Sequence, residues 1–375
     1  MADGKIYRVG VLGASGYTGA DLVRLLCCHP NVEIVFITAD RKAGRSLAEV
    51  FPHLGRLKVP DLISLEDIEW AGVELDVIFC ALPHATSQNV IKGLLHATRH
   101  SLIDELMAEQ PEDIVDDIRG TVKVIDLSAD FRLRDVNVYA EWYGKDHDAP
   151  ELQAKAVYGL TELYRDQIRG ASLVACPGCY PTAALLALVP LLERGAISPE
   201  DIIIDAKSGV SGAGRGMKEQ NLFTEVSEGM HAYGVAAHRH CPEIEQELSL
   251  AAGADVRMNF TPHIVPMNRG EYETIYVRLD PEHTADDLRV MLAERYADEP
   301  FVHVLPEGLT PASRHVRGSN DCILSVHADR VPGRAMVIAT IDNLVKGSSG
   351  QAIQNMNLML GLPEATGLEQ APLFP

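Results

Sequence analysis

An apolar run near the start of the chain passes through a glycine-rich loop straight into a helix pattern. Residues 6–12 are typical of a buried strand, and the loop at 13–19, GASGYTG, leads into apolar residues at 20–26. Its three glycines suit a tight turn, the closest approach of the backbone to a pyrophosphate, and the contact between helix and strand. A second apolar run at 32–38 follows at the distance of a βαβ unit. The spacing therefore predicts that an α/β fold begins here with a dinucleotide-binding unit.

Charged residues follow the second predicted strand. Asp40 is positioned to bind the ribose 2′-hydroxyl of NAD, whereas Arg41, Lys42 or Arg45 would bind the 2′-phosphate of NADP. The three cations favour NADP. An ordinary polar loop is the alternative interpretation, because surface loops often carry charges.

Strand and helix patterns continue to alternate after this unit. Apolar runs at 75–81 and 122–127 predict strands, with a helix from about 85 and an acidic helical stretch at 102–118. This order predicts a Rossmann-type, doubly wound parallel sheet. Ligands bind at the carboxyl edge of such a sheet, which CALPH at 80–84 and DLSADFR at 126–132 would occupy. Arg132 is a candidate ligand for a substrate anion there, with a plain salt-bridge role as the alternative.

The best candidate nucleophile lies in SLVACPGCYPTAALLALVP at 172–190. A short strand pattern stops at Cys176, and Pro181 opens an apolar run that predicts a buried helix. Cys179 then lies at or beside the helix start, where unpaired N–H groups and the helix dipole stabilise a thiolate. A buried structural cysteine is one alternative. A redox pair of Cys176 and Cys179 is another, because a Cys-x-x-Cys spacing lies between a strand and a helix.

The second half of the chain has a different pattern. A strand is expected at 201–206, followed at 207–216 by a flexible loop whose backbone N–H groups could cradle a phosphate or carboxylate. Histidines at 231–245 match no standard zinc spacing, so proton transfer is their preferred role and no metal is expected. Alternating runs then predict a second, α+β domain with a mixed or antiparallel sheet. The runs lie at 260–266, 272–279, 301–305, 322–329 and 334–342, before a Gly/Ser turn at 343–352 that leads into a last helix.

Composition and charge argue against several classes of partner. The 375 residues include 33 basic and 53 acidic side chains, a formal net charge of −20, which disfavours nucleic acid or an anionic membrane as the main partner. The longest apolar segment, at 183–192, is too short to span a bilayer and is interrupted by Pro190. Seven cysteines, an odd number, and a strand pattern that begins at Ile6 without a secretory leader favour a reducing cytoplasm.

Taken together, these motifs resemble those of the N-acetyl-γ-glutamyl-phosphate reductases, relatives of the aspartate-semialdehyde dehydrogenases. The likeness covers nearly the whole chain, and PGCYPTAALLALVP is its most specific part. The resemblance implies NADPH-dependent reduction of an acyl phosphate in arginine biosynthesis, through a thioester on a cysteine, by a cytoplasmic homo-oligomer (dimer or tetramer). The other matching motifs are GASGYTG, CALPH, DLSADFR, VYGLTEL, VSGAGR, HRHCPEI and NLVKGSSGQA.

The resemblance also implies roles for individual residues. Cys179 matches the nucleophile, and His238 matches the acid/base that handles the proton as the thiohemiacetal collapses to the aldehyde. The expected substrate-binding residues are Arg132, Ser208, Gly209, Tyr233, His240 and Glu243. The expected cofactor-binding residues are Gly13, Ser15, Gly16, Tyr17, Thr18, Gly19, Arg41 and Asn343.

Two domains are expected, with the thiol between them. Residues 1–175 with 343–375 would bind NADP, and residues 176–342 would carry the catalytic and oligomerisation functions. The alternatives are the same chemistry on an aspartyl or carrier-linked aminoadipyl phosphate, a non-catalytic NADP-sensing module, and a thioredoxin-like oxidoreductase. Two departures from the family pattern stand out: Cys176 replaces an asparagine found in many members, which leaves a regulatory disulfide open, and the stretch at 99–120 is longer than expected.

Overall fold

The computed structural model describes residues 4–70, 73–94 and 122–373. These residues form two compact units. The first unit contains the chain up to Cys176 together with Ala352–Gly367, and the second contains Pro177–Gln351 together with the residues from Leu368 onward. The helix expected at 102–118 and the long stretch at 99–120 lie outside the described residues.

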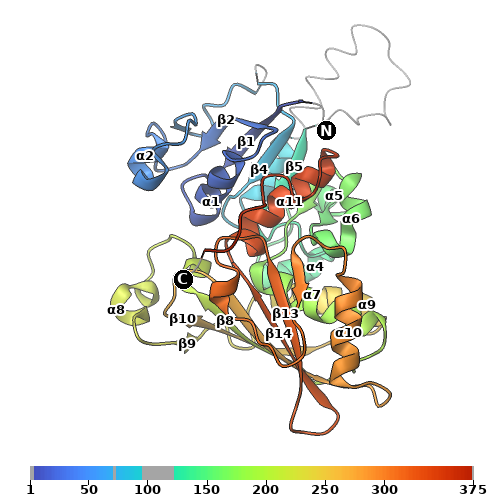
Figure 1. Ribbon diagram of the computed structural model, residues 1–375. Helices are drawn as coiled ribbons and strands as arrows, with labels where there is room; N and C mark the ends of the chain where they lie inside the picture. The colour runs from blue at the N-terminus through green and yellow to red at the C-terminus, as the bar shows by residue number, and fades with distance from the viewer. Residues whose placement is uncertain (1–3, 71–72, 95–121, 374–375) are drawn as a thin grey trace, which may run out of the picture. The chain divides into compact units, whose positions relative to one another are not determined.

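The first unit is built on a sheet whose seven described strands run parallel, in the order β3-β2-β1-β4-β5-β7-β6 (Figure 1). The strand order reverses between β1 and β4, which is where a doubly wound sheet leaves room for a ligand at its carboxyl edge. The predicted Rossmann-type sheet is thus confirmed. The strands are β1 (Tyr7–Leu12), β2 (Val32–Thr38), β3 (Leu62–Ile63), β4 (Val77–Cys80), β5 (Lys123–Asp126), β6 (Val157–Tyr158) and β7 (Leu173–Ala175).

Burial explains why these strands read as continuous apolar runs. Val9 and Val11 of β1 and Ile78 and Phe79 of β4 are all fully buried, as expected for a parallel sheet covered on both faces. Helices and helical turns make the connections. They are α1 (Tyr17–Leu26), α2 (Leu47–Val50), η1 (Pro52–Leu54), residues 87–94, α4 (Val136–Tyr143), α5 (Pro150–Gln153), α6 (Thr161–Arg169) and α11 (Gly350–Met359).

The last helix, α11, returns to the first unit and is held there by several polar side chains, among them Asn355. Asn355 donates from Nδ2 to the Gly159 carbonyl at 2.8 Å and accepts from Thr161 Oγ1 at 2.8 Å. All three residues are buried or closely packed, so these bonds replace water that cannot reach them. The C-terminal helix therefore completes the nucleotide-binding unit.

The second unit contains a mixed sheet of seven described strands in the order β12-β13-β14-β11-β8-β10-β9. The β8/β10 and β12/β13 pairs are parallel and the other pairs are antiparallel, so the predicted second α+β domain with a mixed sheet is confirmed. The strands are β8 (Ile202–Gly209), β9 (His231–Ala232), β10 (Met258–Val265), β11 (Glu271–Arg278), β12 (Val302–Val304), β13 (Cys322–Ala328) and β14 (Arg334–Ile341).

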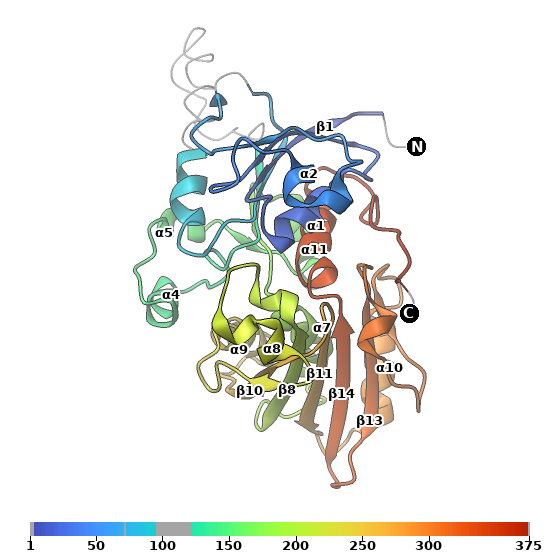
Figure 2. The same cartoon turned by 90° about the vertical axis from the view of Figure 1, so that its left-hand side faces the viewer.

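Helices α7, α9 and α10 form a layer against this sheet (Figure 2). The helix α7 is buried from Tyr180 to Leu192, which explains why this stretch carries no charged side chain. The helical elements of the unit are α7 (Cys179–Glu193), η3 (Val210–Ala213), η4 (Glu219–Asn221), α8 (Phe223–Val226), α9 (Cys241–Ala252), α10 (Ala285–Arg295), η5 (Ser313–His315) and η6 (Val345–Ser349).

Pro190 does not interrupt α7, contrary to expectation. The helix continues to Glu193 although Pro190 has no N–H to donate to the Leu186 carbonyl. Instead, the hydroxyl of Tyr296 donates to this carbonyl at 2.6 Å. A side chain at the end of α10 thus satisfies the acceptor that the proline leaves open.

The loop expected at 207–216 is partly a strand. Lys207, Ser208 and Gly209 belong to β8 and pair with β10, Lys207 and Ser208 also pair with β11, and η3 follows at once. The expectation of a flexible loop from Lys207 was therefore wrong, because pairing with strands distant in sequence extends β8. The segment 343–351 is grouped with the second unit, where Gln351 donates to Thr182 Oγ1 at 2.9 Å.

Within the described part of the chain, no helix is long and apolar enough to cross a membrane.

Candidate active site

Cys179 is the first residue of α7, as the sequence predicts, and is half-buried. The preceding residue, Gly178, caps the helix in an extended conformation. Its N–H donates to Glu243 Oε1 at 2.8 Å, and its carbonyl accepts from Thr182 Oγ1 at 2.9 Å. The backbone that carries the thiol is therefore fixed from both sides, by a buried carboxylate of α9 and by a hydroxyl one turn along α7.

Gly347 packs closely against Cys179. A Cβ added to this glycine would lie 2.7 Å from Cys179 Cβ, closer than carbon atoms normally approach. Gly347 lies in the π-helical turn η6, and its N–H donates to the Asp342 carbonyl at 3.0 Å. Only a residue without a side chain fits between this turn and the thiol.

His238 lies among aromatic rings of the same unit. Its ring centroid is 5.3 Å from that of Tyr233, 5.8 Å from that of Tyr180 and 4.7 Å from that of His240. The backbone N–H of His240 donates to Nδ1 of His238 at 3.1 Å, which leaves the ring proton on Nε2. Burial, with a smaller contribution from the charge of Arg239, lowers the pKa of His238 to about 4. The imidazole is thus neutral near pH 7 and presents an N–H donor.

The two tyrosines beside His238 are hydrogen-bonded to each other, and both are influenced by the charge of the cysteine. The hydroxyl of Tyr233 donates to that of Tyr180 at 3.1 Å. Burial raises the pKa of both phenols, and negative charge on Cys179 and Glu271 raises it further. Cys179, Glu271, Tyr180 and Tyr233 therefore form one cluster, to which His238 is joined through ring contacts.

Glu271 is a member of this cluster that the sequence analysis did not identify. It is fully buried in β11, where it pairs with Ser208 and Ile341. Burial raises the pKa of its carboxyl to about 8, and an interaction with the Cys179 thiol acts in the opposite direction. The sequence did hold an indication: Glu271 is in phase with the apolar residues Ile275 and Val277, so it belongs to the buried face of the strand.

Ser208 and Asn343, two of the predicted site residues, form hydrogen bonds with other residues of the second unit. Ser208 is buried, and its Oγ donates to the Gly209 carbonyl at 3.1 Å. Asn343 accepts from the Gly270 N–H at 2.9 Å and donates to Ser211 Oγ at 3.0 Å. These bonds join the end of β8 to the start of β11 and so shape the backbone next to Glu271.

The predicted residue Arg132 lies in the first unit. Its Nε donates to the Cys176 carbonyl at 2.7 Å and its Nη2 to the Leu127 carbonyl at 3.2 Å. The side chain is buried and links the carboxyl ends of β5 and β7. Through these bonds Arg132 has a structural role at the carboxyl edge of the sheet, where ligands of doubly wound folds bind.

The glycine loop of the first unit fits a dinucleotide. A Cβ at Gly13 would overlap the Ala81 carbonyl, and one at Gly19 would overlap the Gly13 carbonyl. Gly13 also has a φ of +85°, and its N–H donates to Thr38 Oγ1 at 3.1 Å. At Gly16, the N-cap of α1, an added Cβ would have only the Gly13 carbonyl oxygen within 4 Å, so the backbone is open on that side. A pyrophosphate could approach the first turn of α1 here.

Around this loop, Ser15, Tyr17 and Thr18 continue into α1, and Arg41 is exposed after β2, near the exposed Asp40. His84, in the turn after β4, is also exposed and accepts from the Ala129 N–H at 3.1 Å.

Cys176 is a poor candidate for a redox partner. It is buried, accepts from Asn355 Nδ2 at 3.6 Å, and is not disulfide-bonded to Cys179. Burial raises the pKa of its thiol to about 12, which suppresses the thiolate that disulfide exchange requires. The thioredoxin-like interpretation therefore has no support at this position.

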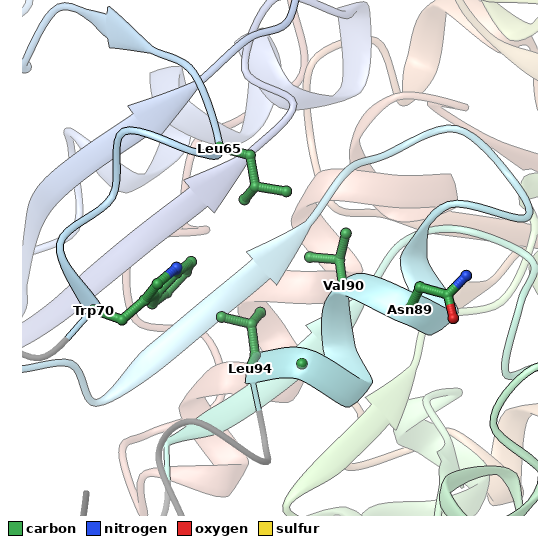
Figure 3. A pocket seen from close by; sticks show the side chains of 6 residues that line it. Leu65, Trp70, Asn89, Val90 and Leu94 are labelled. Atoms are coloured by element: carbon green, nitrogen blue, oxygen red, sulfur yellow. The ribbon is translucent and has the colours of Figure 1, made fainter.

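A hollow of about 260 Å³ in the first unit contains none of the predicted site residues (Figure 3). Leu65, Trp70, Val90 and Leu94 point into it, with Asn89 at its side. This lining is largely apolar and offers no group suited to acyl transfer.

Comparison with known proteins gives two matches to described domain families. Residues 8–105 match the semialdehyde dehydrogenase NAD binding domain, and residues 179–343 match the semialdehyde dehydrogenase dimerisation domain. The second match begins at Cys179 and ends at Asn343.

Curated relatives match along the full chain. An N-acetyl-gamma-glutamyl-phosphate reductase from Afipia carboxidovorans is 55% identical over 373 residues, covering 100% of this chain and 99% of the relative. The chain belongs to the N-acetyl-gamma-glutamyl-phosphate reductase family. The reductase of that name from Rhodospirillum rubrum is 56% identical over 98% of this chain and 99% of its own. A probable chloroplastic member from Arabidopsis thaliana is 54% identical over 99% of this chain and 86% of its own.

Solved structures share the fold of this family at low sequence identity. Aspartate semialdehyde dehydrogenase II from Vibrio cholerae superimposes with a TM-score of 0.69 at 16% identity, covering 95% of this chain and 99% of that one. The Candida albicans aspartate semialdehyde dehydrogenase with NADP gives a TM-score of 0.63 at 16% identity, over 95% and 99% of the two chains. The predicted resemblance and fold class are confirmed, and the chain is an enzyme of a reductase family with a nicotinamide-nucleotide-binding domain.

Proposed function

We propose that this enzyme reduces N-acetyl-γ-glutamyl phosphate to N-acetylglutamate 5-semialdehyde, as the names of its full-length relatives indicate, in the biosynthesis of arginine. One observation carries the proposal: Cys179 begins a buried helix whose next residue, Tyr180, contacts the ring of the neutral His238, in a chain 55% identical to a curated reductase of this substrate. The alternatives with an aspartyl or carrier-linked aminoadipyl phosphate keep the chemistry but differ from the substrate that the names of these full-length relatives give. A non-catalytic NADP-sensing module would not require the cluster that contains the cysteine and the histidine.

In the proposed mechanism the Cys179 thiolate attacks the acyl carbon of the substrate. The C–S bond forms, the bond from carbon to the phosphate oxygen breaks, and phosphate leaves. The helix start and the Nε2–H of His238 stabilise negative charge that develops on oxygen. A reduced nicotinamide cofactor bound by the first unit would supply the hydride that reduces the resulting thioester. His238 would handle the proton of the thiohemiacetal as its C–S bond breaks, which releases the aldehyde and returns the thiolate.

The remaining site residues have supporting roles in this proposal. Glu243 holds the Gly178 N–H and so orients the nucleophile, while Tyr233 and His240 surround His238. Ser208, Gly209 and the amide of Asn343 shape the adjacent backbone. We also retain the proposals that residues 1–175 with 343–375 serve the cofactor and 176–342 the substrate, and that Arg132 binds the substrate.

The finer features of cofactor, assembly and location are proposed on separate grounds. Gly13–Gly19 would hold the pyrophosphate, and exposed Arg41 favours NADP over NAD because a cation pairs with the 2′-phosphate. A homo-oligomer, dimer or tetramer, agrees with the dimerisation domain match and with the exposed apolar side chains of Met217, Leu222 and Phe223. Seven free thiols agree with a reducing cytoplasm.

Replacing Cys179 tests the proposed function directly. C179S should lose turnover of the acyl phosphate by at least ~10³-fold while it still binds NADPH, because a serine at this position lacks an acidic thiol. The matched control is C176S, which changes a buried cysteine three residues earlier and should keep activity within a few fold. Near-normal turnover by C179S would exclude a covalent role for the thiol.

A further inference from the structure

The turn after β4 contains a residue with a strained backbone. Ala85 has a φ of +65°, in the left-handed region that residues with a side chain rarely adopt. Such a conformation persists only where other contacts hold the backbone, and it is commonest at functional sites. One contact here is a hydrogen bond from the Ala85 N–H to Asp130 Oδ1 at 2.8 Å. This bond joins the turn after β4 to the turn after β5.

The turn after β4 also packs against the glycine loop. Strand β4 lies between β1 and β5, so the turns that follow these strands meet at the carboxyl edge of the sheet (Figure 1). A Cβ added to Gly13 would lie 2.3 Å from the carbonyl oxygen of Ala81 and 3.5 Å from the nitrogen of Leu82. A shift of this turn would therefore disturb the loop that is proposed to hold the pyrophosphate.

A second hydrogen bond joins the same two turns in the opposite direction. The Ala129 N–H donates to Nδ1 of His84 at 3.1 Å. Two neighbouring residues of one turn, His84 and Ala85, thus bind two neighbouring residues of the other, Ala129 and Asp130. Because one bond runs in each direction, the pair fixes both the separation and the orientation of the turns.

Asp130 is itself held by three further hydrogen bonds. Its N–H donates to Ser128 Oγ at 3.1 Å, and its Oδ1 also accepts from the hydroxyl of Tyr139 at 3.0 Å. Its carbonyl oxygen lies 2.8 Å from Nε2 of His147. Nε2 is the donor there, because Nδ1 of the same ring accepts from the Ala149 N–H at 3.1 Å. The carboxylate is thus oriented in advance by other residues of the first unit.

Burial of this carboxylate is costly to the fold. Asp130 is fully buried, and among the described residues its Oδ2 has no hydrogen-bond partner. A buried polar atom without a partner lowers stability, and residues that only fill a core are usually apolar. The cost indicates that Asp130 has a function beyond packing, and the bond from its other oxygen to Ala85 suggests which one.

We propose that Asp130 is a positioning residue for the nicotinamide cofactor, because it holds the turn after β4 in the conformation that borders the glycine loop. The inference rests on the proposed function, in which the first unit binds NADPH. Since Asp130 is fully buried, it acts through Ala85 and not by contact with the cofactor.

Loss of this bond should affect binding more than chemistry. Without it, Ala85 can leave the left-handed conformation, and the turn has its binding-competent form for only part of the time. The apparent affinity for the cofactor falls by that fraction. Once NADPH is bound, the turn is ordered again, so the rate at saturating cofactor should change little.

Calorimetric titration of NADPH into full-length D130A tests the proposal. A hydrogen bond to a charged group shifts an equilibrium by about tenfold, so the Kd and the KM for NADPH should rise by ~10-fold. The kcat at saturating NADPH should stay within about threefold of the wild type. A residue that only stabilised the fold would lower Tm and leave the Kd unchanged in the folded protein. D130N keeps an oxygen that can accept from Ala85, so its Kd should stay within about threefold of the wild type.

D76A is the matched control. Asp76 Oδ2 accepts from the Arg8 N–H at 2.8 Å, so the same kind of bond links β4 to β1 at the opposite, amino edge of the same sheet. D76A should keep the wild-type Kd for NADPH, even where its Tm falls.

Substitutions of Ala85 test the same conformation from the other side. Glycine adopts a positive φ readily, so the double variant D130A/A85G should recover a Kd within about threefold of the wild type. Valine strongly disfavours a positive φ, so A85V should raise the Kd by ~10-fold with Asp130 in place, a result that does not require D130A to fold.

Three results would overturn the proposal: wild-type affinity in D130A, wild-type affinity in A85V, or an equal loss of affinity in D130N and D130A. If the wild type binds NADPH and D130A binds it equally well, only this inference fails. If the wild type does not bind NADPH, the proposed function fails as well.

Discussion

Gly347→Ala should impair catalysis by displacing the nucleophile. The added Cβ would lie 2.7 Å from Cys179 Cβ and 3.2 Å from Cys179 Cα and from Ile341 Cδ1. Carbon atoms prefer separations of about 3.5–4.0 Å, so either the turn or the cysteine must move by roughly 1 Å. The turn is buried and anchored by the bond from Gly347 to Asp342, so the start of α7 should take much of the shift.

A displacement of this size is large for a nucleophile. A misplacement of ~1 Å can cost ~10²-fold in rate, equivalent to about 2.7 kcal/mol in the barrier. Overpacking of a buried site should also lower the free energy of unfolding by about 1–3 kcal/mol. We expect kcat to fall by ~10²-fold in an NADPH oxidation assay, while NADPH binding measured by fluorescence stays normal.

Gly170→Ala serves as the control for this variant. Gly170 has a helical conformation, and the nearest atom to an added Cβ is 3.8 Å away. G170A should therefore match the wild type in rate and stability. If G347A retains kcat within about threefold of the wild type, the close contact does not position the thiol, and this account of Gly347 is refuted.

Two further predictions concern the cofactor loop and the histidine. Gly19→Ala should abolish NADPH binding measured by calorimetry, because its Cβ would overlap the Gly13 carbonyl and open the loop; binding at wild-type affinity would contradict the proposed cradle. The stability of the protein should fall as the pH drops from about 6.5 toward 4. The unfolded chain protonates His238 first, since burial lowers its folded pKa to about 4, and binding of that proton favours the unfolded state. Urea unfolding at pH 7 and pH 5 should show a smaller pH difference in H238Q, and an equal difference would exclude this histidine as a source.

The features predictable from sequence were those with a local physical cause. The start of α7 at Cys179 follows from a strand that ends before Pro177, a glycine cap and a proline in the first turn. The parallel order of the first unit follows from alternating strand and helix patterns. In both cases, neighbouring residues along the chain determine the structure.

The features that escaped prediction depend on contacts between distant segments. Continuation of α7 through Pro190 requires Tyr296, which lies 110 residues from the carbonyl that it binds. The extension of β8 to Gly209 requires β10 and β11 on either side. No local pattern reveals that Gly347 packs on Cys179.

Glu271 was missed for a different reason. Glutamates alternate with Tyr272 and Thr274 in its strand, which makes the aromatic face look like the buried one. Only the phase of Ile275 and Val277 shows that the acidic face is inside. Charged residues usually lie on the surface, so buried glutamates are an exception, and such exceptions are expected at functional sites.

The reverse reaction tests the central proposal most directly. N-acetylglutamate semialdehyde would be supplied with NADP, with and without inorganic phosphate, and the absorbance of the reduced nicotinamide would be followed beside a parallel assay with aspartate semialdehyde. The account predicts phosphate-dependent reduction of NADP with the acetylated aldehyde alone. Equal activity with aspartate semialdehyde, or no activity with either aldehyde despite tight NADP binding, would contradict it.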